Sequence, residues 1–333
     1  MHLKWDIRNL TFSPALFAAP LAGITHSPFR RLLADFGGYG ALFTEMLSAR
    51  QILREDLVQS PSLKRRPQEG KVIYQLMMED AEKLDQIVER LAYCAPDGID
   101  INLACHAPNI RTRQAGSGLY ENRESLAEVL ALVRRTWNGL FTVKIRLGSE
   151  RPGWQNRFAE RLKLFEDSGV DAIFFHPRFF EDKFRKRARY ELFDWAASLT
   201  NLPIVANGDM SGPETIEQNH KSLKNVHGYM AGRMMAVQPW FFAAWHKKQP
   251  LVLDYAEIWQ RLFDYILEDF PPEKAISRIK IFTKYYARNF RFGHYFYTKV
   301  YNAPTLEDVR EKATAFLSTQ PEVMPEPSVQ GLC

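Results

Sequence analysis

Eight short apolar runs alternate with helix-like segments along most of the chain, and this alternation limits the possible folds more than any other feature. The runs occupy residues 16–22, 41–46, 72–77, 98–104, 141–147, 172–177, 203–209 and 228–232. The helices expected between and after them cover 27–36, 79–93, 122–137, 157–168, 190–199 and 238–247. Eight strand–helix units predict a TIM (β/α)8 barrel. A doubly wound open sheet is the alternative, although such sheets rarely reach eight regular units.

The strand pattern stops after Pro250, and helical periodicity continues over 254–268, 272–289 and 305–317. After residue 318 come three prolines between 321 and 327, in a segment with the composition of a disordered tail. We therefore predict three parts. These are a catalytic barrel over 1–248, a small C-terminal helical domain over 249–318 and a disordered tail over 319–333.

The composition is that of an ordinary soluble globular protein, with 46% hydrophobic and 25% charged residues. The chain contains no run of about 18 apolar residues, and its first residues lack the apolar core of a secretory signal. The three cysteines, Cys94, Cys105 and Cys333, are too few and too scattered for a disulfide framework or a zinc or iron–sulfur site. We expect a monomeric cytoplasmic protein that binds no metal and does not associate with membranes.

The run at 98–104 is followed at once by a thiol and a glycine-rich loop. Apolar and polar residues alternate from Ile99 onward, Cys105 comes directly after the strand, and residues 116–118 read Gly-Ser-Gly. In a TIM barrel, the active site is built at the C-terminal ends of the strands. Asn102 and Cys105 are therefore candidate site residues, although a lone cysteine is more often an inert packing residue.

Lys144 stands in the middle of the apolar run FTVKIRL. A buried charge is unfavourable unless it is paired. A bound phosphate or an electron-rich ring would satisfy it, and so would an Asp or Glu partner inside the barrel. The two interpretations are equally open from this run alone.

The last two strand ends carry groups that suit a phosphate. They read Asn207-Gly208-Asp209 and Gly232-Arg233. Glycine allows close approach of the backbone, and arginine forms charge-assisted hydrogen bonds to phosphate. Loops after strands seven and eight of a TIM barrel frequently bind phosphate. Each run alone is common, but together at these positions they predict a phosphorylated cofactor.

Seven short motifs, in their order and spacing, resemble the tRNA-dihydrouridine synthases. They are APLAGITHSPFR, IYQLM, DGIDINLAC, AGSGL, VKIRLG, ANGD and AGR. Members of this family are flavin enzymes that reduce the C5–C6 double bond of uridine in RNA. The resemblance covers nearly the whole chain, and it implies a TIM barrel that carries FMN, followed by a helical RNA-binding domain.

The resemblance also implies roles for single residues. At the flavin ring it places Pro20, Leu21, Ala22, Gln75, Lys144 and His176, and at the ribityl phosphate Asn207, Gly208, Asp209, Gly232 and Arg233. It places Asn102 and Arg178 near the substrate, and it makes Cys105 the proton donor. For His176, a hydrogen-bonded core histidine is the less favoured alternative. A positive charge at Lys144 would stabilise the electron-rich reduced flavin.

The chain departs from the family pattern at the rim. Ala104-Cys105-His106 stands where Gly-Cys-Pro is usual, Asn109 where lysine is common, and Pro177 where glycine is usual in His-Gly-Arg. The thiol is kept, so we expect the same chemistry. The RNA species and the target uridine stay open.

The predicted helical domain carries a cationic stretch. Residues 274–299 include seven Lys or Arg and no Asp or Glu. On a continuous helix, one stripe would hold Lys280, Lys284, Arg288 and Arg291. Cations without neighbouring acids suit RNA phosphates, and a solvated charged face is the alternative. A second basic run, KFRKRAR at 183–189, follows the sixth strand on the active-site side.

Together these features predict an FMN-dependent tRNA-dihydrouridine synthase that takes electrons from NADPH and protonates C5 of the base through Cys105. One rival is a flavin oxidoreductase for a free pyrimidine, similar to the dihydroorotate dehydrogenases. The cationic stretch argues against it, because a free base needs no such surface. The other rival is a colourless RNA-binding protein on a barrel without catalysis.

Overall fold

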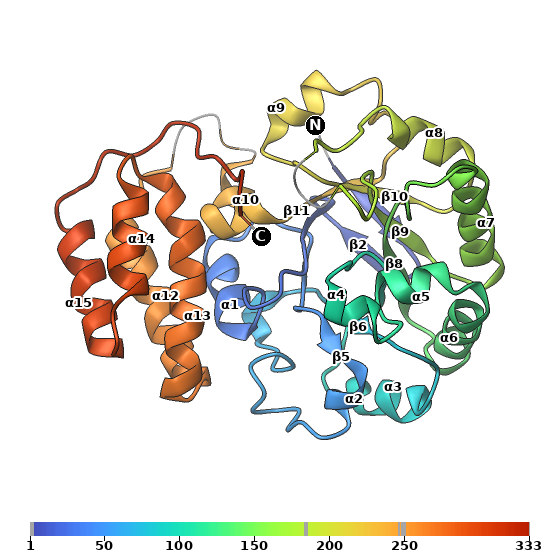
Figure 1. The fold of residues 1–333 in the computed structure, drawn as a ribbon, viewed down its shortest axis with the longest axis horizontal. Helices are drawn as coiled ribbons and strands as arrows, with labels where there is room; N and C mark the ends of the chain where they lie inside the picture. Colours follow the sequence, from blue (N-terminus) through green and yellow to red (C-terminus); the bar gives the residue numbers. More distant parts are fainter. Residues whose placement is uncertain (1–2, 183–185, 246, 248–250, 333) are drawn as a thin grey trace.

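The computed structural model describes residues 3–182, 186–245, 247 and 251–332 (Figure 1). Within these residues, eight parallel strands close into a barrel that is surrounded by helices. In chain order the barrel strands are β3 (Leu16–Ala18), β4 (Ala41–Phe43), β6 (Val72–Met77), β7 (Gly98–Asn102), β8 (Leu140–Arg146), β9 (Ala172–His176), β10 (Ile204–Asn207) and β11 (Gly228–Ala231). Pairing of β11 with β3 closes the ring. The predicted TIM barrel is confirmed, and each predicted apolar run overlaps one of these strands.

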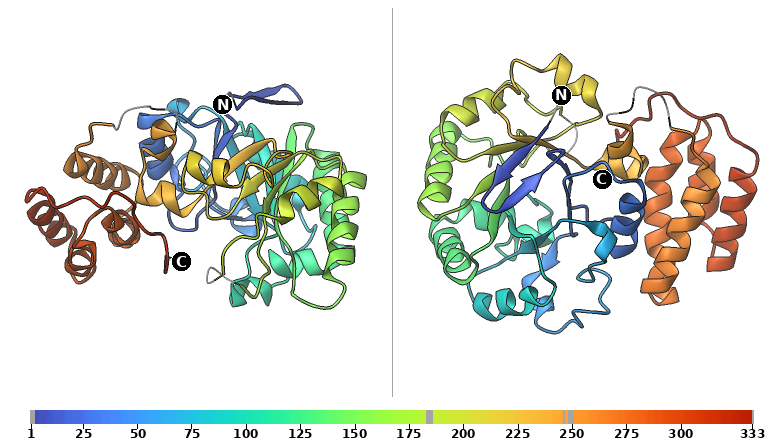
Figure 2. Two further views of the ribbon diagram at one scale, coloured as in Figure 1. Left: turned by 90° about the horizontal axis from the view of Figure 1, so that it is seen from above. Right: turned by 180° about the vertical axis from the view of Figure 1, so that it is seen from behind.

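One end of the barrel is filled by aromatic side chains. A hairpin that the sequence did not predict, β1 (Trp5–Ile7) with β2 (Leu10–Phe12), lies across the N-terminal end of the barrel (Figure 2). The ring of Phe12 lies 5.0 Å from that of Phe17 on β3, and Phe17 lies 5.2 Å from Phe174 on β9. These rings belong to a buried cluster inside the barrel. The polar strand ends therefore gather at the opposite end.

Helices follow most of the strands and cover the outside of the barrel. They are α1 (Ser27–Phe36), α3 (Leu84–Ala92), α6 (Arg123–Thr136), α7 (Trp154–Asp167), α8 (Leu192–Ser198), α9 (Pro213–Gln218) and α10 (Arg233–Val237). Shorter elements in the loops are β5 (Leu47–Ser48), α2 (Ala49–Ile52), η1 (Pro67–Glu69), α4 (Pro108–Arg111), α5 (Ser117–Glu121) and α11 (Phe241–Ala244). The helix predicted over 238–247 is present only as the single turn α11. Gln238, which precedes a proline, has an extended-like backbone that separates α10 from α11.

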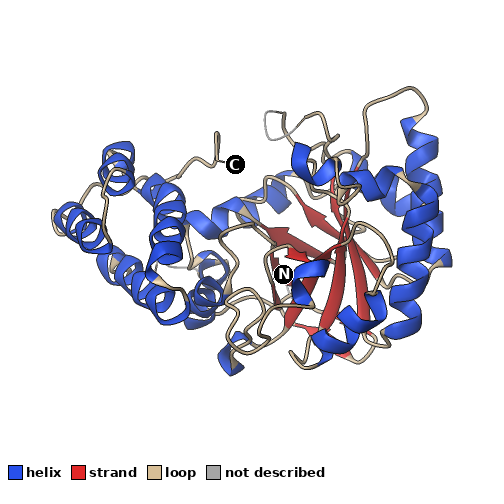
Figure 3. Cartoon of the chain, turned by 60° about the horizontal axis from the view of Figure 1, so that its bottom comes forward, coloured by secondary structure: helices blue, strands red, loops and turns tan. Residues whose placement is uncertain are grey.

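A helical region packs beside the barrel (Figure 3). It contains α12 (Tyr255–Asp269), α13 (Pro272–Tyr286), the 3-10 turn η2 (Ala287–Asn289), α14 (Gly293–Tyr301) and α15 (Leu306–Leu317). The sequence did not predict α14. The rings of Phe29 on α1 and Phe282 on α13 lie 6.1 Å apart, and one apolar cluster runs through both parts. A domain boundary at 248/249 stays a prediction. In the described part of the chain, no helix is long and apolar enough to cross a membrane.

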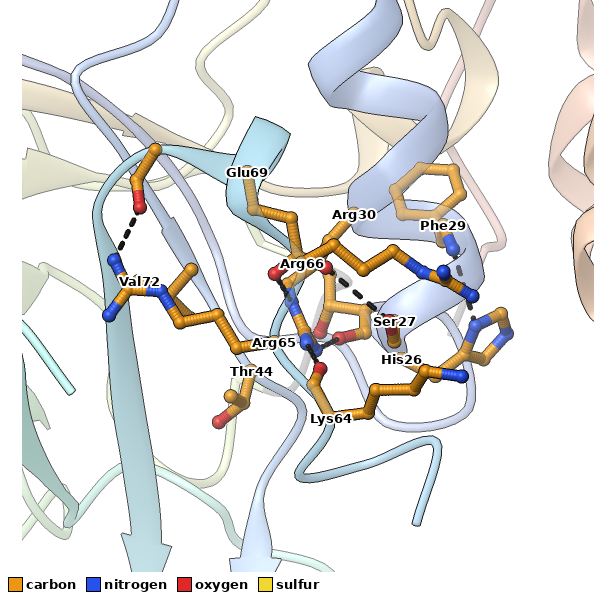
Figure 4. A network of polar contacts seen from close by, with 12 residues as sticks. His26, Ser27, Phe29, Arg30, Thr44, Lys64, Arg65, Arg66, Glu69 and Val72 are labelled. Carbon is orange, nitrogen blue, oxygen red and sulfur yellow. Dashed lines mark hydrogen bonds and ion pairs between the residues drawn. The ribbon is translucent and has the colours of Figure 1, made fainter. Parts of the chain in front are cut away.

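A buried ion pair holds α1 against the loop before β6 (Figure 4). The guanidinium of Arg30 donates from Nε to Glu69 at 3.0 Å, and both side chains are fully buried. Arg30 also donates to the backbone oxygens of Thr25 at 2.9 Å and Lys64 at 2.5 Å. Because Thr25 belongs to the loop that follows β3, this pair fixes one side of the barrel mouth.

The segment after α15 has defined contacts, in contrast to the predicted disordered tail. The N–H of Met324 donates to the backbone oxygen of Asn289 at 2.7 Å, and Phe290 forms a bridge with Val323. Leu332 is fully buried. Composition alone misses these contacts because their partners lie elsewhere in the chain.

Candidate active site

The candidate residues stand at the C-terminal ends of the barrel strands, here called the mouth, and the pairing of neighbouring strands brings several of them together. In the pairing of β7 with β8, Asn102 lies opposite Lys144. In the pairing of β8 with β9, Arg146 lies opposite His176. Lys144 and Arg146 are two residues apart on β8, so the polar groups of three neighbouring strands lie close together near the C-terminal end of the barrel, as the sequence predicted from the strand ends.

A chain of buried hydrogen bonds connects β6, β7 and β8. Asp100 accepts from the Thr142 hydroxyl at 2.6 Å and from Nε2 of Gln75 at 2.7 Å. Nδ2 of Asn102 donates to Oε1 of Gln75 at 2.8 Å. Burial raises the pKa of Asp100 to about 7. These hydrogen bonds engage both the oxygen and the nitrogen of the Gln75 amide, and they leave Oδ1 of Asn102 facing the following loop.

The loop that carries Cys105 is held from two sides. Oδ1 of Asn102 accepts from the backbone N–H of Ala104 at 3.1 Å and of Cys105 at 2.9 Å. The backbone oxygen of Cys105 accepts from the N–H of Ser117 at 2.8 Å. Gly116 has φ +55°, and a Cβ there would lie 2.6 Å from the Cys105 oxygen. The Cys105 thiol is free and half-buried, whereas Cys94 is buried.

Lys144 is buried, with 8% of its surface exposed. Burial, reinforced by the charge of Arg146, lowers the pKa of Lys144 to about 8, against the opposing influence of Asp100 and Cys105. Among the described residues, none forms a hydrogen bond or an ion pair with its ammonium group. The internal ion pair that the sequence left open is therefore not found there. A buried cation without a protein partner fits a bound anion or an electron-rich ring.

His176 is neutral in this arrangement. Its Nε2 lies 2.8 Å from Nη1 of Arg178, and because a guanidinium only donates, Nε2 accepts. Burial and then the nearby charge of Arg146 lower the pKa of His176 well below its usual range. Arg178 is 2% exposed and donates from Nη2 to Asp209 at 2.6 Å. Arg178 was predicted to contact the substrate, but the structure places it beneath the surface, where it orders His176 and Asp209.

The ends of β10 and β11 form an anion corner, defined here as Gly208, Asp209, Gly232 and Arg233. Gly208 has φ +117°, and a Cβ there would lie 2.8 Å from the ring of His176, so only glycine fits without a shift. Asp209 accepts from Nη2 of Arg233 at 3.0 Å as well as from Arg178. One carboxylate thus serves two guanidinium groups. Asp209, predicted at the phosphate, orients Arg233 in the structure. Asn207 donates from Nδ2 to the backbone oxygen of Met230 at 3.0 Å.

The loop after β3 carries Pro20, Leu21 and Ala22, the first two half-buried and the third exposed. The hydroxyl of Thr25 accepts from the N–H of Leu21 at 2.9 Å. Glu45, for which no role was predicted, accepts from the N–H of Gly23 at 2.7 Å. Glu45 stands near the end of the predicted strand 41–46, and this position could have indicated a site residue.

The cationic stripe predicted on the helical region is interrupted. Helix α13 ends at Tyr286, so Arg291 leaves the stripe and pairs with Glu322 at 2.7 Å. Nζ of Lys280 donates to the backbone oxygen of Ala303 at 2.6 Å. Lys284 is half-buried and Arg288 is exposed, and no acid within the described residues pairs with either.

Two further basic features lie near the mouth. Of the basic run 183–189, residues 183–185 lie outside the described part, and Lys186 and Arg189 both pair with Asp182. Arg278 of α13 was not singled out from the sequence. A Cβ on Gly23 would lie 2.8 Å from its Nη1, so this arginine reaches the loop after β3. In the described residues, no group of His, Cys, Asp or Glu could hold a metal ion.

The model of the dihydrouridine synthase (Dus) family matches residues 17–317. The tRNA-dihydrouridine synthase B of Proteus vulgaris is 32% identical over 233 residues, which cover 68% of this chain and 69% of that protein. A probable tRNA-dihydrouridine synthase of Helicobacter pylori is 30% identical over 232 residues, 68% of each chain. Among solved structures, a variant of NCR from Zymomonas mobilis has a TM-score of 0.54 at 17% identity, covering 79% of this chain and 97% of that one. This last likeness concerns the fold alone.

Proposed function

The chain belongs to the dihydrouridine synthase family, and we propose that it reduces the C5–C6 double bond of uridines in tRNA to give dihydrouridine. The family model covers the barrel from β3 onward and the helical region to the end of α15. In this proposal the cofactor is FMN, the electron donor is NADPH and the proton donor is Cys105. One NADPH, one proton and one uridine give one NADP+ and one dihydrouridine.

The observation that carries the proposal is Lys144, a buried cation with no hydrogen-bond or ion-pair partner among the described residues. It lies beside a strand end that leads directly into Cys105. A charge in this position stabilises a ring that accumulates electrons. The thiol of Cys105 lies at the same mouth, within reach of a substrate that stacks on a cofactor ring held by Lys144. A cofactor ring and a substrate base together account for both features.

The residues of the mouth fit FMN in their chemistry. Lys144 would hold the electron-rich edge of the flavin ring, with Pro20, Leu21 and Ala22 along the ring and Gln75 and His176 near it. Gly208, Gly232 and Arg233 would hold the phosphate, with Asn207 and Asp209 fixing their loops. When bound, FMN supplies two-electron transfer from NADPH to C6 of the uracil. A neutral His176 adds no charge there, and because its Nε2 accepts from Arg178, its ring proton is on Nδ1.

Cys105 would donate a proton to C5 of the base while C6 receives hydride. The clamp formed by Asn102 and Ser117 on the Cys105 backbone holds the thiol at one place on the rim. Proton donation leaves a thiolate, and because Cys105 is half-buried, solvent can restore its proton. Asn102 would lie next to the base and set the direction of the thiol.

The tRNA must present an unstacked uridine, because a paired and stacked base hides its C5–C6 bond. Lys284 and Arg288 lie on the helical region without acid partners in the described residues. They would contact phosphates of the tRNA while the target base enters the mouth. Arg278, on the same helical region, comes close to Gly23 in the loop after β3.

The test uses purified full-length protein and tRNA transcribed without modifications. We expect a yellow protein that releases FMN on denaturation, and NADPH-dependent formation of dihydrouridine detected by mass spectrometry of the digested tRNA. Mapping dihydrouridine in RNA from cells with and without the gene would identify the target position. A protein that binds no flavin after reconstitution, or that reduces a free pyrimidine but not tRNA, would contradict the proposal.

A further inference from the structure

The segment after α15 runs back from the helical region to the barrel mouth. Its end lies near α10 in Figure 1. Residues 322–332 are referred to below as the strap. The family model ends at residue 317, so the strap lies beyond the part of the chain that the family model matches.

The strap is anchored on the helical region at its start. The N–H of Arg291 donates to the backbone oxygen of Glu322 at 3.0 Å, and the two side chains form an ion pair. Phe290 and Val323 form an antiparallel bridge, and the N–H of Met324 donates to Asn289. These backbone contacts fix the direction in which the strap leaves the helices.

The far end of the strap reaches the anion corner. Nη1 of Arg233 donates to the backbone oxygen of Val329 at 3.3 Å. Leu332 is fully buried and belongs to the main apolar cluster, whereas most residues between Val323 and Gly331 are exposed. An exposed segment with one fully buried leucine near its end is held by that leucine, because removing an apolar side chain from water is favourable.

The contact with Arg233 leaves the charge of the corner intact. A backbone carbonyl is neutral, so Val329 orients the guanidinium without cancelling its charge. Within the described residues, Asp209 is a carboxylate that both Arg178 and Arg233 contact, so two guanidinium groups meet at this corner. The corner under the strap therefore suits a phosphate, and a chain segment lying across it would obstruct the exit of that phosphate.

We propose that the strap is part of the cofactor site: it covers the anion corner through Val329 and Leu332 and slows the release of bound flavin. The proposal deepens the proposed function, since it presumes a flavin phosphate at Arg233. As a consequence, flavin exchange depends on the contacts that anchor the strap to the helical region. The strap reaches Arg233 through Val329, which is 96 residues away in the sequence.

The experiment measures the release of FMN from the loaded protein after dilution, by the rise in flavin fluorescence. A chain that ends at Ser318 should release FMN at least about tenfold faster than the full chain, which corresponds to about 1.4 kcal/mol. Leu332→Asp in the full-length chain should act in the same direction, because a buried carboxylate expels the end of the strap. Glu326→Gln, at an exposed strap position, is the matched control and should release FMN at the wild-type rate.

The two hypotheses fail in different ways. A full-length protein that binds no flavin refutes the proposed function. A full-length protein that binds flavin, together with a Leu332→Asp variant that releases it at the wild-type rate or more slowly, overturns the strap alone. Slower release would mean that the strap competes with the phosphate. Because Leu332→Asp keeps the whole chain, it decides the question even where the shortened chain does not fold.

Discussion

The side-chain oxygen of Asn102 accepts a hydrogen bond from the backbone N–H of Cys105 at 2.9 Å. The same amide donates to Gln75, which in turn donates to the buried carboxyl of Asp100. The position of the thiol on the rim is thus tied to the interior of the barrel through three side chains. A change at Asn102 alters the aim of Cys105 without touching the sulfur.

Asn102→Ala should slow single-turnover reduction of tRNA by at least about tenfold, while the protein keeps its flavin. The variant frees the loop of Cys105 and removes the donor to Gln75, and misplacing a reacting group by about 1 Å can cost 100-fold. Asn122→Ala is the control, because Asn122 caps α6 through the N–H of Ser125 and lies outside the mouth. It should cost about 1 kcal/mol of stability and leave the rate unchanged. Equal rates in the two variants would remove Asn102 from the site.

Lys144→Met should change how the stability of the flavin-free protein depends on pH. The pKa of Lys144 is lowered to about 8 in the fold by burial, and that of an exposed lysine is about 10.4. Between these values the unfolded chain binds the proton more tightly, so stability rises with pH across that window. The variant should lose this rise, as seen in melting temperatures from pH 7 to 10.5, and should also retain flavin poorly. An unchanged slope would mean that Lys144 is not buried as a cation.

Arg30→Ala should lower the free energy of unfolding by about 3–5 kcal/mol, because it leaves the fully buried Glu69 without its partner. The double variant Arg30→Met/Glu69→Met should recover part of that loss, since two apolar side chains leave no buried charge. Urea unfolding measures both. The exposed pair of Lys163 and Asp167 provides the control, and Lys163→Ala should change little. A small effect of Arg30→Ala would show that the pair does not brace α1.

The barrel could be predicted from the sequence because each strand is a local apolar run. All seven residues of β8 are buried, and Lys144 stands out in that run as a charge that needs an explanation. The hairpin β1–β2 escaped prediction because its strands have three residues each, too few to show a period. The polar residues of the active-site end could be predicted too, because they stand at the C-terminal ends of the predicted strands.

Pairings between distant segments could not be predicted in the same way. Arg291 fell on a cationic stripe only while α13 was assumed to continue, and its partner Glu322 lies 31 residues away. Arg178 was placed near the substrate, and its contacts with His176 and Asp209 were not predicted. Each of these depends on which loops meet in space, and one sequence does not carry that information.

Lys284→Ala/Arg288→Ala should weaken tRNA binding and lower the salt dependence. Each lost phosphate contact reduces the slope of log K against log salt by about 1, so the double variant should lose about 2. Arg310→Ala/Lys312→Ala removes the same charge from α15, where both cations already pair with acids, and should leave the slope nearly unchanged. Filter binding at several salt concentrations measures both. A similar loss in both variants would mean that net charge, and not this surface, attracts the tRNA.

Cys105→Ala should keep FMN and still accept electrons from NADPH, yet form little or no dihydrouridine. Hydride transfer to C6 needs a proton at C5, and the variant lacks the donor that Asn102 and Ser117 hold at the mouth. Cys105→Ser should also be poor, because a hydroxyl is a much weaker acid than a thiol. Cys94→Ala removes the other thiol in the described residues and should leave the rate unchanged, since Cys94 is buried. The measurement is single-turnover reduction of unmodified tRNA by the prereduced protein. If Cys105→Ala forms dihydrouridine at the wild-type rate, another group donates the proton, and the clamp on the Cys105 backbone has only a structural role.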